Sequence, residues 1–431
     1  MNQPTNLELA QALDVRAARL HLLEQYYRAQ QPLAYLSPEA KKALGPRFGV
    51  LGVNYPRLAV LSIAERLRVS AFMVDGVRSS QAWQMWLRAD LDQRAPVAHR
   101  EALSLGESSV IVWAGADGKA TASVESAHQV AVYRDAGSGA TLAAIKRWED
   151  LAPDGTARQT RYVVYRPDRI EHLIADGSSI TAAKVERTVD NPLLAVPVVP
   201  LLNADRALDR FGVSEIDDLA PLVDGLNKTL ADMLVASEYT ARPRRWATGL
   251  ELEERQVVDE NGEPVFDDGE PVIETVNPIA ETDRMMVNEA PEGKFGQLAG
   301  ADLAPYGQAV DVLVQQIMAV SALPAHYVGI TGANPASADG IRAAEAALTA
   351  RAESKSSAFG RSWEQVMRLM LAINNGGEVD DYGVQVRWAD PATRSKAQEA
   401  DAAVKLHEAG ILSTDEVREQ LGLTATEGTA A

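Results

Sequence analysis

The stretch FGVSEIDDLAPLVDGLNKTLADM, residues 211–233, carries the pattern that says most about the fold of this chain. Its apolar residues recur at spacings of 3, 4, 3, 4 and 3, at Ile216, Leu219, Val223, Leu226, Leu230 and Met233. This a/d spacing predicts a helix with one narrow apolar stripe. Pro221 either kinks this helix or lies in its first turn, because proline has no backbone N–H to donate inside a helix.

A second narrow stripe follows later in the chain. Its residues are spaced 4, 3, 4 and 3, at Tyr306, Val310, Leu313, Ile317 and Val320, and Pro324 ends it. An antiparallel helix pair packed on the core is the usual meaning of two such stripes, and spacing alone favours it. The narrowness of the stripes also suits helices that contact like helices of neighbouring subunits around a ring.

The segment between the two stripes is strongly acidic. Residues 251–294 hold 14 Asp and Glu against three Lys and Arg, a net charge of −11. Short β-forming runs at 257–258, 264–266 and 272–276 are separated by Asn-Gly and Asp-Gly, dipeptides that favour tight turns. A small β module is therefore predicted. Its charge either keeps the protein soluble or forms a docking surface or a channel wall that repels phosphate.

The first 200 residues change from helical to strand periodicity. Helices are predicted at 7–30, 55–68, around 83–91 and at 99–105. From about residue 108 the period becomes two, which predicts strands at 109–113, 130–133, 143–148, 161–165 and 170–174. An antiparallel β region that follows a helical one predicts the α+β class.

The second stripe is followed by a loop and a long helix. Residues 322–336 contain two Pro and two Gly, which predicts an exposed connector or a mobile loop that contacts something in a channel. The loop contains no Lys or Arg, so it is not suited to a tight grip on phosphate. A helix is predicted from Ser337 to about Asn374, then a strand at 384–388 and two short helices.

Composition narrows the functional classes. The chain has 431 residues, a net charge of −18 and no cysteine, which excludes disulfides, Cys-ligated zinc, iron–sulfur clusters and thiol nucleophiles. The acidic balance argues against a protein that coats nucleic acid non-specifically. The polar first 20 residues predict no signal peptide, and the longest apolar run, 193–202, is too short to cross a bilayer. We expect synthesis in a cytosol and no membrane insertion.

No catalytic motif emerges from the sequence. It contains no GxxxxGK[ST], no GxGxxG after a strand and no HExxH, and its six His lie far apart. Asp pairs at 217–218, 267–268 and 380–381 could imitate a nuclease carboxylate cluster, but helix caps and solvated charge explain them better. We therefore predict no enzyme, no metal and no cofactor.

Several short segments, in their order along the chain, resemble tailed-bacteriophage portal proteins. They are YYR (26–28), QPLAYL (31–36), VNYPR (53–57), HREAL (99–103), the run 106–113, FGVSEI (211–216), LNKTLADM (226–233), LPAHYVG (323–329), NPASADGIR (334–342) and GILS (410–413). The resemblance extends from about residue 20 to 423. FGVSEI leading into LNKTLADM is its most specific part.

The resemblance implies a subunit made of wing, stem, clip and crown, within a ring of twelve. It assigns 1–213 to the N-terminal wing, 214–242 to the first stem helix, 243–302 to the clip, 303–321 to the second stem helix, 322–336 to the tunnel loop, 337–376 to a long wing helix and 377–431 to a short crown. The apolar residues of both stripes would then pack the stem.

The implied function is a portal at one capsid vertex of the virion, made in the bacterial host cytoplasm. Such a ring is a conduit for DNA packaging and ejection, and double-stranded DNA would pass through it weakly bound. Its other partners would be the major capsid protein, the terminase, and then head-completion and tail proteins.

The resemblance also points to candidate contact residues. The tunnel-loop candidates are Pro324, His326, Tyr327, Asn334 and Ser337. Arg242, Arg244 and Arg245, at the stem–clip junction, are candidate contacts to DNA or a partner, and local salt bridges explain them equally well. Two other classes compete with a portal: a capsid-associated adaptor without a channel, and a metal-dependent hydrolase or nuclease whose carboxylates converge only in the fold.

Overall fold

The chain divides into two compact units in a computed structural model: residues 1–227 with 312–431, and residues 228–311. The structure describes residues 3–34, 52–152, 155, 157–177, 179–204, 206, 209, 211–241, 245–248, 253–258, 263–267, 270–276, 292–297, 300, 302–330, 337–376, 378–392, 396–414 and 417–418. We call the two parts unit 1 and unit 2.

Unit 1 contains most of the predicted helices, with some boundaries moved. They are α1 (Asn6–Tyr27), α3 (Tyr55–Ala64), α4 (Ser80–Arg88), α5 (Leu91–Leu105), α8 (Ala338–Asn375) and α9 (Lys396–Glu408), with short 3-10 turns η2 (Ile180–Ala182), η3 (Ala325–Val328) and η4 (Val379–Asp381). The helix predicted over 55–68 was wrong at its end, because the chain turns after Ala64 into strand β1 (Val69–Val74). The helix predicted over 99–105 begins earlier, at Leu91.

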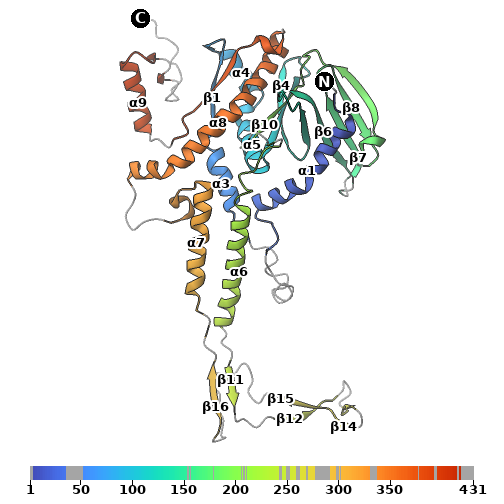
Figure 1. The fold of residues 1–431 in the computed structure, drawn as a ribbon, viewed down its shortest axis with the longest axis vertical. Helices are drawn as coiled ribbons and strands as arrows, with labels where there is room; N and C mark the ends of the chain where they lie inside the picture. Colours follow the sequence, from blue (N-terminus) through green and yellow to red (C-terminus); the bar gives the residue numbers. More distant parts are fainter. Residues whose placement is uncertain are drawn as a thin grey trace. The chain divides into compact units, whose positions relative to one another are not determined.

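Three antiparallel sheets complete unit 1 and confirm the α+β class (Figure 1). The largest has the order β5 (Val130–Arg134), β6 (Thr141–Leu151), β7 (Ala157–Tyr165), β8 (Arg169–Ala175), β9 (Lys184–Asp190). The second has the order β10 (Val198–Leu202), β3 (Glu107–Ala114), β4 (Ala120–Ser126), and the third β17 (Val384–Trp388), β1, β2 (Val77–Arg78). The third joins residues more than 300 positions apart, since Phe72 lies opposite Val386.

The five-stranded sheet buries both of its faces. Leu9 and Leu13 of α1 pack on one face, against Ile145 and Tyr162. Val163 and Ile170 on the other face pack against Val198 of β10. Because successive side chains of a strand point to opposite faces, β7 supplies both cores from neighbouring residues.

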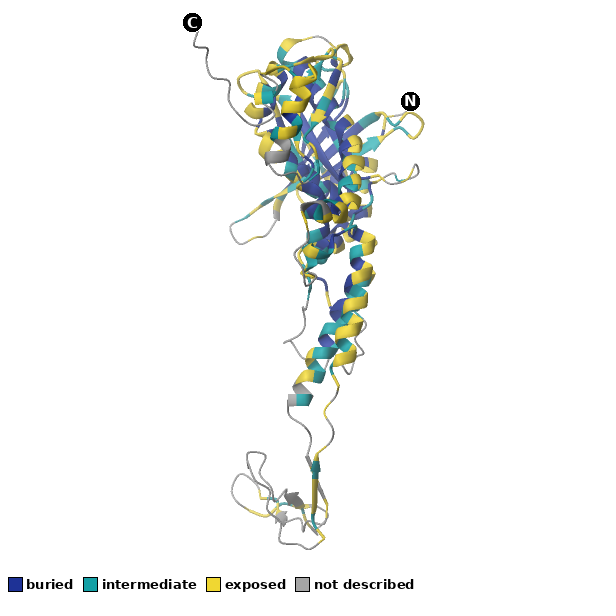
Figure 2. Ribbon diagram, turned by 90° about the vertical axis from the view of Figure 1, so that its left-hand side faces the viewer, coloured by how far each residue is buried: buried dark blue, intermediate teal, exposed yellow. Residues whose placement is uncertain are grey.

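The main core of unit 1 lies along α8. Phe359, Trp363 and Met370 are fully buried there, and the Trp363 ring lies 5.0 Å from the Trp86 ring at an edge-on angle of 78°. Figure 2 shows the buried residues gathered in the sheets and central helices of this unit. The long helix predicted over 337–374 is thus confirmed, with Ser337 as its N-cap.

Unit 2 is entered through α6 (Ala220–Ala241) and left through α7 (Ala304–Ser321). Pro221 lies in the first turn of α6, where its missing N–H costs no helical hydrogen bond. The predicted β module is present as antiparallel pairs: β11 (Arg245–Thr248) with β16 (Lys294–Gln297), β12 (Glu253–Gln256) with β15 (Ile273–Val276), and β13 (Phe266–Asp267) with β14 (Glu270–Pro271). Among the residues between 242 and 303 whose side chains the structure describes, none is buried.

Candidate functional site

The two apolar stripes are buried unevenly. Ile216, Leu219, Val223 and Leu226 are at most 1% exposed, and Ile317 is fully buried. The remaining stripe residues are half-buried (Leu230, Met233, Tyr306, Val310 and Leu313) or exposed (Val320). A methyl group added to Gly225 would lie 3.6 Å from Leu313 Cδ2, so α6 and α7 are in contact where both belong to unit 1.

Two of the tunnel-loop candidates are linked to a buried carboxylate of α8, His326 directly and Tyr327 through Arg66. Glu345 is 4% exposed; its Oε1 lies 3.2 Å from His326 Nε2 and its Oε2 accepts a 3.0 Å hydrogen bond from Arg66 Nη2. The same Arg66 nitrogen donates to the Tyr327 hydroxyl at 3.1 Å. Because His326 contacts Glu345 directly and Tyr327 accepts from the Arg66 that pairs with it, residues 325–328 are held against α8.

The remaining candidate residues lie at the ends of structural elements or outside the described residues. Pro324 is the N-cap of η3, and Ser337 caps α8 by accepting a 3.1 Å hydrogen bond from the Gly340 N–H. Arg245 is the first residue of β11. Arg242, Arg244 and Asn334 lie outside the described residues.

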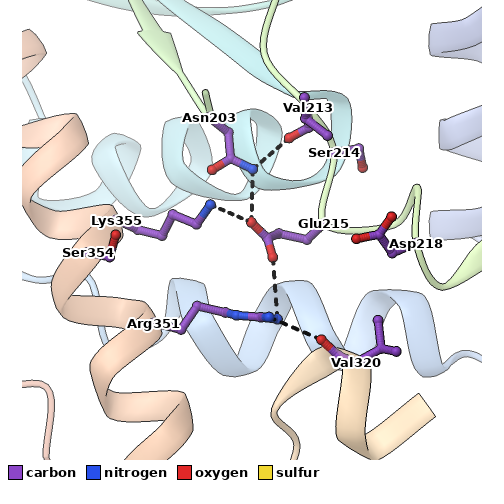
Figure 3. A pocket seen from close by; sticks show the side chains of 9 residues that line it. All are labelled: Asn203, Val213, Ser214, Glu215, Asp218, Val320, Arg351, Ser354 and Lys355. Carbon is purple, nitrogen blue, oxygen red and sulfur yellow. Dashed lines mark hydrogen bonds and ion pairs between the residues drawn. The ribbon is translucent and has the colours of Figure 1, made fainter. Parts of the chain in front are cut away.

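A second ionic cluster lies just before α6 and lines a pocket of about 310 Å³ (Figure 3). Glu215 Oε1 accepts hydrogen bonds from Lys355 Nζ at 2.7 Å and from Asn203 Nδ2 at 3.0 Å. Arg351 Nη1 lies 3.6 Å from Glu215 Oε2, and Arg351 Nη2 donates to the Val320 carbonyl at 3.0 Å. Arg351 therefore joins α8 to both the segment that precedes α6 and the end of α7.

Replacing Glu215 with Ala should lower the free energy of unfolding by about 2–4 kcal/mol, because a buried charge pair that loses one partner leaves the other unsatisfied. The side chain of Lys355 is only 14% exposed, so water cannot fully replace the carboxylate. Urea denaturation of Glu215→Ala measures this. Glu353→Ala is the matched control, because Glu353 is an exposed acid of α8, the helix that contains Lys355. It should change the free energy of unfolding by less than about 0.5 kcal/mol. Equal effects of the two variants would contradict the role of Glu215.

Sequence reasoning missed Glu345, Arg66, Glu215, Arg351 and Lys355. One signal was available: Glu345 lies four residues after Ile341 and three before Leu348, a spacing that places it on the same side of the predicted long helix as these two apolar residues. An acid on such a face needs a buried partner. The partner of Glu345 is Arg66, which lies 279 residues away in the chain. No local pattern in the sequence identifies it as that partner.

Within the described part of the chain, no group of three or more His, Cys, Asp or Glu side chains is placed to hold a metal.

None of the helices that the structure describes combines the length and apolar character needed to cross a bilayer.

A family model and two curated relatives all match this chain to phage portal proteins. The family model for phage portal proteins of the SPP1 Gp6-like type matches residues 8–427. The portal protein of Mycobacterium phage D29 is 31% identical over 439 residues, which cover 97% of this chain and 86% of the relative. That of Mycobacterium phage L5 is 31% identical over 390 residues, covering 87% and 76%.

Solved structures of low sequence identity are also similar. A chain from the neck of an empty gene transfer agent particle gives a TM-score of 0.48 at 13% identity, with 94% of both chains covered. A chain from the neck of the native particle gives 0.43 at 16% identity, covering 96% of this chain and all of the other. The match of the family model over nearly the whole length, together with the two mycobacteriophage relatives, shows that this chain belongs to the SPP1 Gp6-like family of phage portal proteins.

Proposed function

We propose that this chain is the subunit of a closed ring of twelve copies at one vertex of a phage capsid, and that double-stranded DNA enters and leaves the head through the ring. In this role it works without catalysis and without a cofactor. The terminase, and later head-completion and tail proteins, dock on it, and the major capsid protein surrounds it in the virion.

The observation that carries the proposal is the make-up of unit 2. Its described strands form two-stranded pairs, and no described side chain between 242 and 303 is buried. Large apolar side chains are exposed on these pairs: Trp246 (45%), Phe266 (59%), Ile273 (54%) and Phe295 (39%). An isolated two-stranded ribbon is marginally stable in water, so the described pairs need further partners. Neighbouring copies and docking proteins supply them in a portal ring.

The negative net charge of the chain supports a conduit that binds DNA only weakly. Twelve copies of a chain with a net charge of −18 would carry −216. A channel wall of the same sign as the phosphates gives weak, salt-screened contact, so DNA can slide along it. An isolated ring that bound duplex DNA tightly at physiological salt would contradict this part of the proposal.

Electron microscopy of the purified full-length protein, viewed end-on, tests the ring. A closed ring with an axial hole is the expected result. A solid or open assembly would favour a capsid-associated adaptor without a channel. A monomer with metal-dependent hydrolysis that is lost on changing one Asp pair would favour the nuclease alternative.

Arg242, Arg244 and Arg245 are proposed as the contacts to phosphate or to a docking partner. Changing all three to Ala should reduce DNA retention or packaging severalfold, because each lost phosphate contact weakens binding and lowers its salt dependence. An in vitro packaging assay measures this, with the ring checked by electron microscopy. Unchanged packaging by a stable ring would leave local salt bridges as the role of these arginines.

A further inference from the structure

Helix α1 carries large apolar side chains on two opposite sides. Its inner side carries Leu9, Leu13, Leu20 and Leu23, which are at most 4% exposed and pack into unit 1. At 100° per residue, positions 7, 11, 15, 18 and 22 lie within one arc on the other side. These are Leu7 (45% exposed), Gln11, Val15 (79%), Ala18 and Leu22 (47%), and we call them the outer stripe.

An outer stripe of this kind is unusual for a helix that already packs on a core. A surface helix normally turns charged or polar residues to solvent, and a helix that is apolar on more than one side is normally covered on each of them. The spacing of the outer stripe, 4, 4, 3 and 4, is narrow, and it suits contact along one element more than contact with a broad surface. No described residue of the chain covers it.

The charges beside the outer stripe are already satisfied within the chain. Asp14 accepts a 2.6 Å hydrogen bond from Arg147, and Arg19 lies 2.5 Å from Asp217. Glu8 accepts hydrogen bonds from the Thr5 backbone at 2.7 Å and from its hydroxyl at 2.9 Å, as part of the capping box of α1. The outer stripe is thus an electrically neutral strip on a strongly acidic chain.

We propose that the outer stripe of α1 is a contact between neighbouring copies of this chain, an inference that rests on the proposed ring. Two copies with a net charge of −18 each repel one another, so their contact is least costly where charges are absent or paired internally. A basic or acidic foreign partner would find no complementary charge there. In a closed ring of more than two copies the contact is heterologous, so the stripe packs on a different face of the neighbour and not on the neighbour's α1.

Thiol labelling of the full-length protein tests the contact without background, since the chain has no cysteine. Val15→Cys should react rapidly with a maleimide in separated subunits and at least tenfold more slowly in assembled rings. Val77→Cys, at a site 70% exposed on β2, shows that the reagent reaches assembled protein. Leu23→Cys, at a site 3% exposed, shows full protection.

The outcomes separate the two proposals. If rings form and the thiol of the Val15→Cys variant stays as reactive as in separated subunits, or becomes protected only when capsid protein is added, the contact between copies is wrong while the ring stands. If the protein stays monomeric at every concentration, both alone and with capsid protein added, both are wrong. Rapid disulfide formation between two copies of the Val15→Cys variant would show α1 meeting itself, and would overturn the heterologous arrangement.

A charge in the outer stripe gives a second measurement. Val15→Glu should raise the protein concentration at half-assembly by at least tenfold, since a carboxylate would be desolvated in the contact. The melting temperature of the separated subunit should not change, because the site is exposed there. Val77→Glu is the matched control and should change half-assembly by less than twofold. Equal assembly by Val15→Glu and Val77→Glu would overturn the proposal.

Discussion

Gly212→Ala is expected to lower the free energy of unfolding by about 4 kcal/mol or more, or to prevent folding of the full chain. A methyl group on Gly212 would lie 1.6 Å from the carbonyl oxygen of Gly106, a backbone atom that cannot rotate away. Gly106 itself has a φ of +92°, which disfavours any other residue there. The two glycines let the chain before α6 cross the end of α5 in backbone contact.

The crossing is held by several hydrogen bonds that a displaced backbone would lose. The Asn203 N–H donates to the Gly106 carbonyl at 2.8 Å, and the Glu215 N–H donates to the Leu103 carbonyl at 2.9 Å. Ser214, 4% exposed, donates its hydroxyl to the Ser104 carbonyl at 2.5 Å. Loss of the crossing would therefore also disturb the Glu215 cluster that lies directly after it.

Urea denaturation of Gly212→Ala, followed by tryptophan fluorescence, measures the effect. Gly307→Ala is the matched control, because a methyl group on Gly307 in α7 meets no atom within 4 Å. Ala is the better helix former, so this control should gain up to about 1 kcal/mol. A Gly212→Ala protein as stable as the control would show that the two chain segments do not cross as described.

Acidification from pH 7.5 to pH 5 should remove about 2 kcal/mol of stability through His99 alone. Burial lowers the pKa of His99 from 6.5 to about 3, because the charged ring would lose its hydration. The unfolded chain therefore binds a proton between pH 6.5 and 3 that the folded chain does not. Stability from this group is complete above pH 6.5 and is lost progressively as the pH falls towards 3.

The surroundings of His99 explain why the neutral ring is preferred. It is fully buried, and its Nε2 accepts a 2.8 Å hydrogen bond from the Trp363 indole N–H. Its ring is stacked on Phe359 at 5.6 Å between centroids. Protonation of His99 at Nε2 would place its N–H opposite the indole N–H of Trp363, so two donors would face each other without an acceptor in the core.

His99→Gln separates this contribution from that of the carboxylates, because Gln can accept the Trp363 hydrogen bond but does not titrate. The variant should be less stable at pH 7 by about 1–3 kcal/mol, since the stacking on Phe359 is lost. Its stability should then fall less steeply with acid, by about 1.4 kcal/mol per pH unit between pH 6.5 and pH 4. Parallel pH profiles for the two proteins would show that His99 takes up its proton without unfolding.

These experiments address contacts that join distant parts of unit 1, and sequence reasoning found none of them. It did identify the segments concerned. HREAL and FGVSEI, which contain His99 and Gly212, were among the segments that resemble portal proteins. Nothing within either segment indicates that Gly212 meets Gly106 or that His99 meets Trp363, because the partners lie 106 and 264 residues away.

The sequence by itself determined the local structure and the family. The 3–4 spacing of Val223 to Met233 and of Tyr306 to Val320 determined two helices, and the run after Ser337 determined a third, because helical periodicity is a property of neighbouring residues. The first stripe was wrong at its start, because Ile216 and Leu219 lie in the turn that precedes α6. Only the tertiary structure decided which groups meet: β17 with β1, Glu345 with Arg66 and His326, and Glu215 with Lys355 and Arg351. The pairing of groups so far apart depends on how the whole chain packs, and a buried charge accepts whichever partner that packing brings within hydrogen-bond distance.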